Sequence, residues 1–412
     1  MNGMTRRGLL TATIGTAGVL GSARAARAAT GPTIRLGVLN DQSSAYRDNG
    51  GAGSVACVKL AVAELAKELG LTVEVVAADH GNKTDAALGI ARQWLDEGVD
   101  AVCDLQNSGI ALAVSDLVRQ RDRVCQAFNV GTGDLTGKAC TPNTVHWAYD
   151  SDMLARVAGT ALVKNGADTW FFIRADYAFG RALQDDATKA IDHAGGKVLG
   201  SVALPFPSTD FAAALLQAQS SGAKVIALAN GGGDLVNAVK QAGEFGITQR
   251  GQKLASLLVF INNVRAIGLA SAQGLVLTET FYWDRNDRSR AFTERVMAAG
   301  FDRGARPNMA HAACYAGTRH YLRAVAAMGA AEAKKSGAAL VARMKQMPIE
   351  NDLYEGASIR ADGRVVSPAY LFEVKTPAES RGDWDLYKLL ATVPVDQAWR
   401  PLADGGCTMS RA

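Results

Sequence analysis

The sequence predicts an α/β fold in which two doubly wound parallel-sheet lobes enclose one cleft. The chain has 412 residues, of which 48% are hydrophobic, so it can bury two cores and exceeds one ordinary domain. Short apolar segments alternate with segments of helical periodicity, the pattern of a parallel sheet covered by helices on both faces. This alternation of strand-like and helix-like segments occurs in two successive series, which predicts two such units. The C-terminal part of the chain has a different pattern.

The first 28 residues have the composition of an export signal. A basic start is followed by an apolar stretch over residues 8–20 and by Ala26-Arg27-Ala28, a small-x-small site, so we expect cleavage near Ala28. The paired Arg6 and Arg7 predict a twin-arginine signal, and a general secretory signal with two unrelated arginines is the alternative. The mature chain is expected in the periplasm.

The charge and hydropathy of the remaining chain exclude several classes of partner. The formal net charge is +4, and the four arginines of residues 1–28, which contain no acid, account for all of it. A neutral mature chain with both signs interspersed is not expected to bind nucleic acid. No later segment approaches the roughly 18 apolar residues of a membrane span. The first cysteine, Cys57, lies far from the cleavage site, so no lipid anchor is expected.

The first predicted unit covers residues 33–130. Its apolar segments have strand length and end in polar residues, and each is followed by a turn and a helical pattern. The predicted strands are residues 33–41, 71–79, 100–106 and 123–130, and the predicted helices are residues 54–69, 86–98 and 110–120.

The second predicted unit follows residues 143–151 and has the same alternation. Its helices are expected at residues 153–164, 181–194, 211–219 and 235–242, and its strands at residues 169–174, 197–204, 224–230 and 253–260. Residues 274–284 then resemble a strand that returns toward the first unit, before helices at residues 289–299 and 309–331. Residues 353–374 predict a hairpin turned by Asp362-Gly363.

The ends of the predicted strands are unusually polar. Because ligands of such sheets bind beyond the carboxyl ends of the strands, these corners are candidate binding residues. Helix caps and tight turns are the alternative at any single corner. Tyr177 and Phe179 also stand where a strand hands over to a helix, as a ligand wall or as a plug of the sheet edge. The candidates are Tyr46, Gln106, Asn107, Ser108, Asn129, Thr132, Tyr177, Phe179 and Asn230.

The sequence contains no arrangement of reactive groups typical of an enzyme. The five histidines, His80, His146, His193, His311 and His320, form no H-E-x-x-H motif, and no G-x-S-x-G elbow occurs. The run Asn230-Gly-Gly-Gly-Asp234 lacks the G-x-G-x-x-G spacing of a dinucleotide site. We therefore expect no catalysis, no metal site and no cofactor.

The six cysteines contain no C-x-x-C pair, so neither a zinc ribbon nor a thioredoxin-like motif is predicted. Cys103 and Cys125 fall at like positions in successive predicted strands, which makes them a candidate disulfide pair. Cys57 and Cys314 lie in helical patterns and are expected to be buried thiols.

Several motifs together resemble the substrate-binding proteins of bacterial ABC importers, in the branch similar to leucine/isoleucine/valine-binding proteins. These motifs include IRLGVLNDQS, DLTGKACTPNTVHW, ADYAFGRAL and AQGLVLTETFYWDRND, and the resemblance covers nearly all of residues 33–407. It implies a type I periplasmic binding fold with three crossover segments, a monomer that closes around one small molecule, and an inner-membrane permease as partner. Expected lobes are residues 29–146 with 279–348, and residues 147–278 with 349–412.

The resemblance also assigns roles to single residues. Asn107 and Ser108 match positions that hold a ligand carboxylate, and Thr132 matches the next hydroxyl. Tyr46 and Tyr177 match aromatics that contact the ligand from opposite lobes, and Tyr315 matches one near the hinge. Related chains carry cysteines at the positions of Cys140 and Cys407, which implies a disulfide between them.

Asn262 departs from the resemblance, because amino-acid binders place an acid there for the ligand ammonium. Only Asp41, Asp176 and Asp234 are other carboxylates near the predicted corners. Asp234 resembles a helix cap and Asp176 a helix-start charge, while Asp41 remains a candidate ammonium partner. We therefore expect a small carboxylate, aromatic acid or amide-like solute in place of an amino acid. A ligand-sensing protein of the same fold that feeds a receptor, and an exported enzyme with a cofactor, are the alternative functions.

Overall fold

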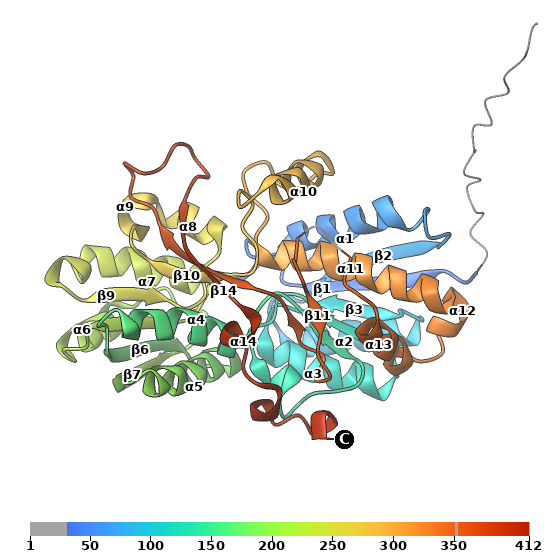
Figure 1. Cartoon of the computed structure of the whole chain (residues 1–412), viewed down its shortest axis with the longest axis horizontal. Helices are drawn as coiled ribbons and strands as arrows, with labels where there is room; N and C mark the ends of the chain where they lie inside the picture. The colour runs from blue at the N-terminus through green and yellow to red at the C-terminus, as the bar shows by residue number, and fades with distance from the viewer. Residues whose placement is uncertain (1–30, 351–352, 412) are drawn as a thin grey trace, which may run out of the picture.

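The computed structural model describes residues 31–350 and 353–411, which form two lobes side by side (Figure 1). The predicted signal segment lies outside the described residues. The first lobe is built on a five-stranded parallel sheet of order β2-β1-β3-β4-β5. Its strands are β1 (Ile34–Asn40), β2 (Val73–Asp79), β3 (Ala101–Asp104), β4 (Val124–Ala127) and β5 (Thr144–His146). Its crossover helices are α1 (Gly51–Leu65), α2 (Thr84–Asp96) and α3 (Ser108–Gln120).

The second lobe is built on a four-stranded parallel sheet of order β7-β6-β8-β9. Its strands are β6 (Thr169–Ala175), β7 (Lys197–Leu204), β8 (Val225–Ala229) and β9 (Lys253–Ser256). The helices of this part of the chain are α4 (Ser151–Lys164), α5 (Ala178–His193), α6 (Ala212–Ser220), α7 (Gly232–Glu244), α8 (Ile261–Ile267) and α9 (Leu269–Ala272). The predicted α/β class with two parallel-sheet lobes is confirmed.

After α9 the chain returns through β10 (Val276–Glu279) to the first lobe, where α11 (Met309–Met328) packs along α1. A third sheet, of order β10-β13-β14, is antiparallel. The hairpin predicted around Asp362-Gly363 is present as β11 and β12. The remaining elements are α10 (Asp287–Ala298), α12 (Ala330–Ala333), α13 (Gly337–Gln346), β11 (Ser358–Ile359), β12 (Val365–Val366), β13 (Ala369–Val374), β14 (Tyr387–Val393) and α14 (Val395–Ala398).

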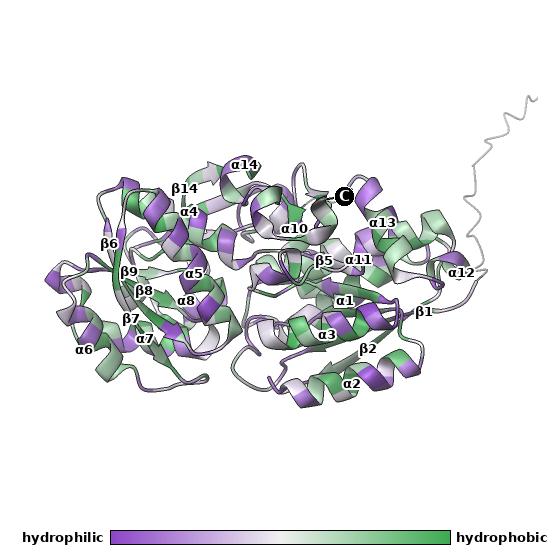
Figure 2. Cartoon of the chain, turned by 90° about the horizontal axis from the view of Figure 1, so that it is seen from below, coloured by the Kyte–Doolittle hydropathy of each residue, from purple (hydrophilic) through white to green (hydrophobic). Residues whose placement is uncertain are grey.

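Each parallel sheet is apolar on both faces, because helices cover both. In β1, Leu36 and Val38 belong to the core on the side of α1, and Leu39 belongs to the separate core against α2 and α3. Figure 2 shows strands that are largely green and helices banded in green and purple, as amphipathic helices are. The first of these cores continues into the second lobe through α4 and α5. Within residues 31–350 and 353–411, no helix has the length and apolarity to cross a bilayer.

The cysteines divide into one bonded pair and four buried thiols. A disulfide joins Cys140 to Cys407 and ties the C-terminal tail to the first lobe. The candidate pair Cys103 and Cys125 is wrong, because both are free. Their strands are neighbours, but Cys125 lies opposite Val102 and Cys103 lies opposite Gln126, so the two thiols point to opposite faces of the sheet.

Candidate ligand-binding site

The carboxyl ends of both parallel sheets face each other across one small cavity. Loops that follow β1, β3, β4 and β5 line it from the first lobe, and loops that follow β6 and β9 line it from the second. Strand ends that converge on one cleft are the usual ligand position in such folds. The lining residues are Tyr46, Asn49, Gln106, Asn129, Gly131, Tyr149, Tyr177, Phe179, Leu258 and Phe260.

Aromatic rings from both lobes meet at the cavity. The hydroxyls of Tyr46 in the first lobe and Tyr177 in the second are hydrogen-bonded to each other. Phe206, from the loop after β7, stacks on both rings, with centroids 5.2 Å from Tyr46 and 4.8 Å from Tyr177. The rings leave a cavity volume of about 10 Å³. A ligand larger than a water molecule therefore has to part this aromatic group as it binds.

The second lobe also approaches the first closely at Gly232. This residue has φ +62°, and a Cβ on it would lie 2.5 Å from the Ala45 carbonyl oxygen of the first lobe. The N–H of Gly233 donates to the same oxygen at 3.4 Å. The glycine run after β8 therefore provides backbone contact between the lobes.

The cavity carries no charge near neutral pH. Among the residues that the structure describes, no acidic or basic side chain lines it. Burial raises the pKa of the Tyr46 phenol well above its usual value, and the adjacent Tyr177 raises it further. Burial likewise raises the pKa of Tyr149 and of Tyr177. The three phenols are therefore neutral hydrogen-bonding groups.

Two of the three carboxylates named from the sequence are fully engaged in local contacts. Asp41 is buried and accepts hydrogen bonds from the N–H groups of Ser43, Ser44 and Tyr46 and from the Ser44 hydroxyl, so it shapes its own loop. Asp176 is half-exposed and pairs with Arg174 and Arg181, each at 2.9 Å. Asp41, the candidate ammonium partner, is therefore occupied by contacts within its own loop and does not line the cavity.

Asp234 is the third carboxylate, and it does not cap α7 as its position suggested. Its side chain accepts a hydrogen bond at 3.1 Å from the N–H of Ser208, two residues after Phe206. Burial raises the pKa of Asp234 to about 7, and the Ser208 hydrogen bond only partly opposes this effect. A carboxyl that is half protonated at neutral pH is a poor partner for an ammonium group.

Gln106 lines the cavity, as predicted, but its amide positions the neighbouring loop. Its Oε1 accepts from the N–H of Asp41 at 2.5 Å, and its Nε2 donates to the Tyr46 carbonyl at 3.1 Å. Asp104, Leu105 and Gln106 have φ values of 78°, 72° and 46°, a conformation that costs energy for residues other than glycine. This strained corner holds Tyr46 in place.

The residues matched to a ligand carboxylate hydrogen-bond within the protein. Asn107 Oδ1 caps α3 by accepting from the N–H groups of Gly109 and Ile110. Ser108 Oγ accepts from the N–H of Thr132, and Thr132 Oγ1 accepts from the N–H of Asp134, each at 3.2 Å. The helix-cap interpretation holds for Asn107, and the structure places none of Asn107, Ser108 and Thr132 in the cavity lining.

Three further candidates also lie outside the cavity lining. Asn230 is buried, and its amide makes no hydrogen bond within the described chain. Asn262 hydrogen-bonds to backbone atoms of Asp48 and Arg306. It lines an outer groove, separate from the cavity, together with Asp48, Asn237 and Asp302. Tyr315 bonds to Glu64 and Arg295, neither of which lines the cavity. Tyr46, Gln106, Asn129, Tyr177 and Phe179 are the predicted residues that the structure does bring together.

Besides Gly131, the structure adds four lining residues that sequence reasoning missed. Asn49 is buried, and its Oδ1 accepts no hydrogen bond within the described chain. Tyr149 donates from its hydroxyl to Asn129 Oδ1 at 2.8 Å and packs edge-on against Phe260. Leu258 completes the wall from the second lobe. Phe260 ends a predicted strand, so the rule that selected Tyr177 could have found it, whereas Tyr149 follows β5, a strand that the sequence analysis did not predict.

The buried histidines fix backbone rather than line the site. Each of four buried histidines places its Nε2 near a backbone carbonyl oxygen. The pairs are His80 with Leu105, His146 with Val130, His311 with Gly50, and His320 with Met344. Burial lowers the pKa of His146 to about 3 and of His311 to about 4. In the described part of the chain, no group of three His, Cys, Asp or Glu residues is arranged to hold a metal ion.

Comparison with known proteins gives a consistent set of relatives. A family model described as periplasmic binding protein matches residues 33–382. A periplasmic binding protein from Burkholderia mallei is 42% identical, with a TM-score of 0.86 over 92% of this chain and 99% of that one. A branched-chain amino acid ABC transporter periplasmic ligand-binding protein from Burkholderia xenovorans is 36% identical, with a TM-score of 0.80 over 91% of this chain and 99% of its own.

The fold is also shared with more distant proteins. A solute-binding protein of an ABC transporter from R. palustris, solved in complex with 4-hydroxybenzoate, is 24% identical, with a TM-score of 0.80 over 89% of this chain and 99% of that one. At this identity the likeness concerns the fold alone. A comparison with curated protein sequences found no match.

Proposed function

The chain belongs to the periplasmic binding protein family, and we propose that it is the solute-binding component of an ABC importer for a small, flat solute without an ammonium group. One observation supports this choice of ligand class. The cavity between the lobes is lined by aromatic rings and amides, with no charged side chain among the described residues. Export to the periplasm, a monomeric state and delivery of the closed form to a membrane permease are part of the same proposal.

The absence of a lining carboxylate disfavours an α-amino acid as the ligand. An ammonium group in a dry cleft needs an anionic partner or several acceptors, since an unpaired buried charge costs several kcal/mol. Asp41 and Asp176 are engaged elsewhere, and Asp234 has a raised pKa. Asn262, at the position where amino-acid binders carry an acid, is a neutral amide outside the cavity lining.

The rings and amides favour an aromatic solute with a polar group. Tyr177, Tyr149 and Phe260 offer flat apolar surface, which stacks well on another ring. Asn49 Oδ1 is a buried acceptor available to a ligand hydroxyl or amide. A ligand carboxylate would bind to hydroxyl and amide groups, because no Lys or Arg lines the cavity in the described chain. Hydroxylated aromatic acids and aromatic amides have this chemistry.

Isothermal titration calorimetry tests the ligand class. The protein is titrated with benzoate, 4-hydroxybenzoate and benzamide, and in parallel with leucine, isoleucine, valine and phenylalanine. We expect micromolar binding, about −8 kcal/mol, for at least one member of the first set and none for the second. Micromolar binding of an aliphatic amino acid would contradict the proposal and would require a carboxylate to move into the cavity.

A further inference from the structure

Asn262 makes a set of hydrogen bonds that join the two lobes at the outer rim of the cleft. It lies in α8, whose apolar residues belong to the core of the second lobe. Its Oδ1 accepts from the N–H of Arg306 at 3.1 Å, and its Nδ2 donates to the carbonyls of Arg306 at 3.2 Å and Asp48 at 3.3 Å. Arg306 precedes α11, and Asp48 precedes α1, so both partners belong to the first lobe.

The chemistry of this contact requires an amide. Asn262 pairs with both the N–H and the carbonyl of one residue, so one end of its side chain must accept while the other donates. A carboxylate can accept from the N–H of Arg306 but would repel the two carbonyl oxygens. The departure from an acid at this position is thereby explained without a ligand.

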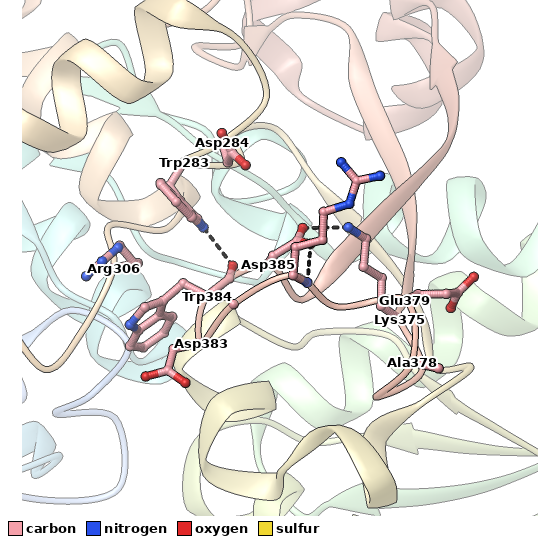
Figure 3. Close-up of a pocket in the computed structure, with 11 residues that line it drawn as sticks. Trp283, Asp284, Arg306, Lys375, Ala378, Glu379, Asp383, Trp384 and Asp385 are labelled. Atoms are coloured by element: carbon pink, nitrogen blue, oxygen red, sulfur yellow. Dashed lines mark hydrogen bonds and ion pairs between the residues drawn. The ribbon is translucent and has the colours of Figure 1, made fainter.

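The side chain of Arg306 supports the same joint. Its guanidinium lies over the rings of Trp283, at 5.3 Å, and Trp384, at 5.2 Å. Figure 3 shows Arg306 beside these two indoles, with the Trp283 ring nitrogen donating to the Trp384 carbonyl at 3.1 Å. Trp384 comes from the hairpin between β13 and β14 and packs on the core of the second lobe. The guanidinium of Arg306, from the first lobe, thus stacks on Trp384, an indole that packs on the second lobe.

We propose that Asn262 and Arg306, with Trp283 and Trp384, form an interlobe clamp that holds part of the ligand-free chain in the closed form. None of the four lines the ligand cavity. Their contacts form when the lobes close and are lost when the lobes part, whether or not a solute is bound. The clamp therefore sets the ratio of open to closed protein, and through it the apparent affinity for any ligand.

Small-angle X-ray scattering of the ligand-free chain tests the clamp. Bound solute is removed by unfolding in guanidinium and refolding, and circular dichroism confirms that each variant is folded. Asn262→Ala and Arg306→Ala are compared with Asn237→Ala, a matched control whose amide lines the same outer groove from α7. We expect the ratio of open to closed protein to rise about tenfold in the two clamp variants, seen as a larger radius of gyration, and to stay unchanged in the control.

A radius of gyration for Asn262→Ala equal to that of the wild type and of Asn237→Ala would overturn the clamp. This measurement needs no ligand, so its outcome is separate from that of the proposed function.

Asn262→Asp distinguishes a clamp residue from a ligand residue. The clamp predicts that this variant also opens and gains no binding of leucine by calorimetry. A compact Asn262→Asp variant that acquires leucine binding would instead show that residue 262 contacts the ligand, and would overturn the assignment.

Discussion

The substitution Gly232→Ala tests whether the lobes close as the structure shows. Gly232 begins α7 with φ +62°, and its missing side chain allows the second lobe to reach the loop that carries Tyr46. An added Cβ would lie 2.5 Å from the Ala45 carbonyl oxygen and 3.0 Å from Cδ1 of Tyr46. Both contacts cross the cleft, so they oppose closure and leave the open form unaffected.

The magnitude follows from two separate costs. The left-handed backbone conformation costs an alanine about 1 kcal/mol in both forms, which lowers the free energy of unfolding without changing affinity. The clash with Ala45 acts in the closed form alone, and overpacking of this kind costs about 1–3 kcal/mol. Taking about 2 kcal/mol, and about 1.4 kcal/mol for each factor of ten, we expect the ligand to bind about 30-fold more weakly.

Calorimetry with the ligand from the panel above measures this loss, and thermal unfolding measures the loss of stability. Gly233→Ala is the matched control, because its Cβ would meet nothing within 4 Å and alanine is favoured over glycine in a helix. The control should bind like the wild type. Equal affinities for Gly232→Ala and Gly233→Ala would refute the closed arrangement of the two lobes.

Three further predictions concern the rings, a buried acid and the disulfide. Tyr177→Ala should weaken ligand binding by about 2–4 kcal/mol by calorimetry, whereas a lower melting temperature with unchanged affinity would favour the sheet-edge plug. Because burial raises the pKa of Asp234 to about 7, the folded chain binds more protons than the unfolded one, so this residue lowers stability as pH rises from about 4 to 7. Asp234→Asn should therefore melt above the wild type at pH 8 and equal to it near pH 4; a constant difference would contradict this. Cys140→Ser should lower the free energy of unfolding by up to about 5 kcal/mol, since the disulfide spans 267 residues, and unchanged denaturant unfolding would contradict a stabilising role.

The helices and strands could be predicted from the periodicity of apolar residues, but the residues at which helices begin were predicted less accurately. α7 begins at Gly232, three residues before the predicted start, and α5 begins at Ala178 instead of residue 181. In α7 two glycines and Asp234 precede the first apolar residue, Leu235, so periodicity gives no signal there. In α5, Phe179 and Leu183 already stand at helical spacing, so the earlier start could have been predicted. The candidate pair Cys103 and Cys125 failed because strand order does not reveal the register, which decides the face of each side chain.

The location of the site, at a set of strand ends, could be predicted from the sequence. The hydrogen-bond partners of each polar side chain there could not. Tyr46 and Tyr177 lie in the cavity because the topology brings the ends of β1 and β6 to one cleft. Ser108 and Thr132 stand at such ends too, yet they hydrogen-bond backbone N–H groups. Short hydroxyl and amide side chains serve caps and ligands with the same atoms, so the three-dimensional arrangement has to decide between the two roles.

A crystal structure of the protein with its tightest-binding solute tests the central claim most directly. We predict that the solute lies between Tyr46 and Tyr177, with its ring against Phe260 or Tyr149 and a hydrogen bond to Asn49 or Asn129. No side-chain carboxylate should contact it. A solute seated instead in the outer groove beside Asn262, or paired through an ammonium group with Asp41 or Asp234, would contradict the account.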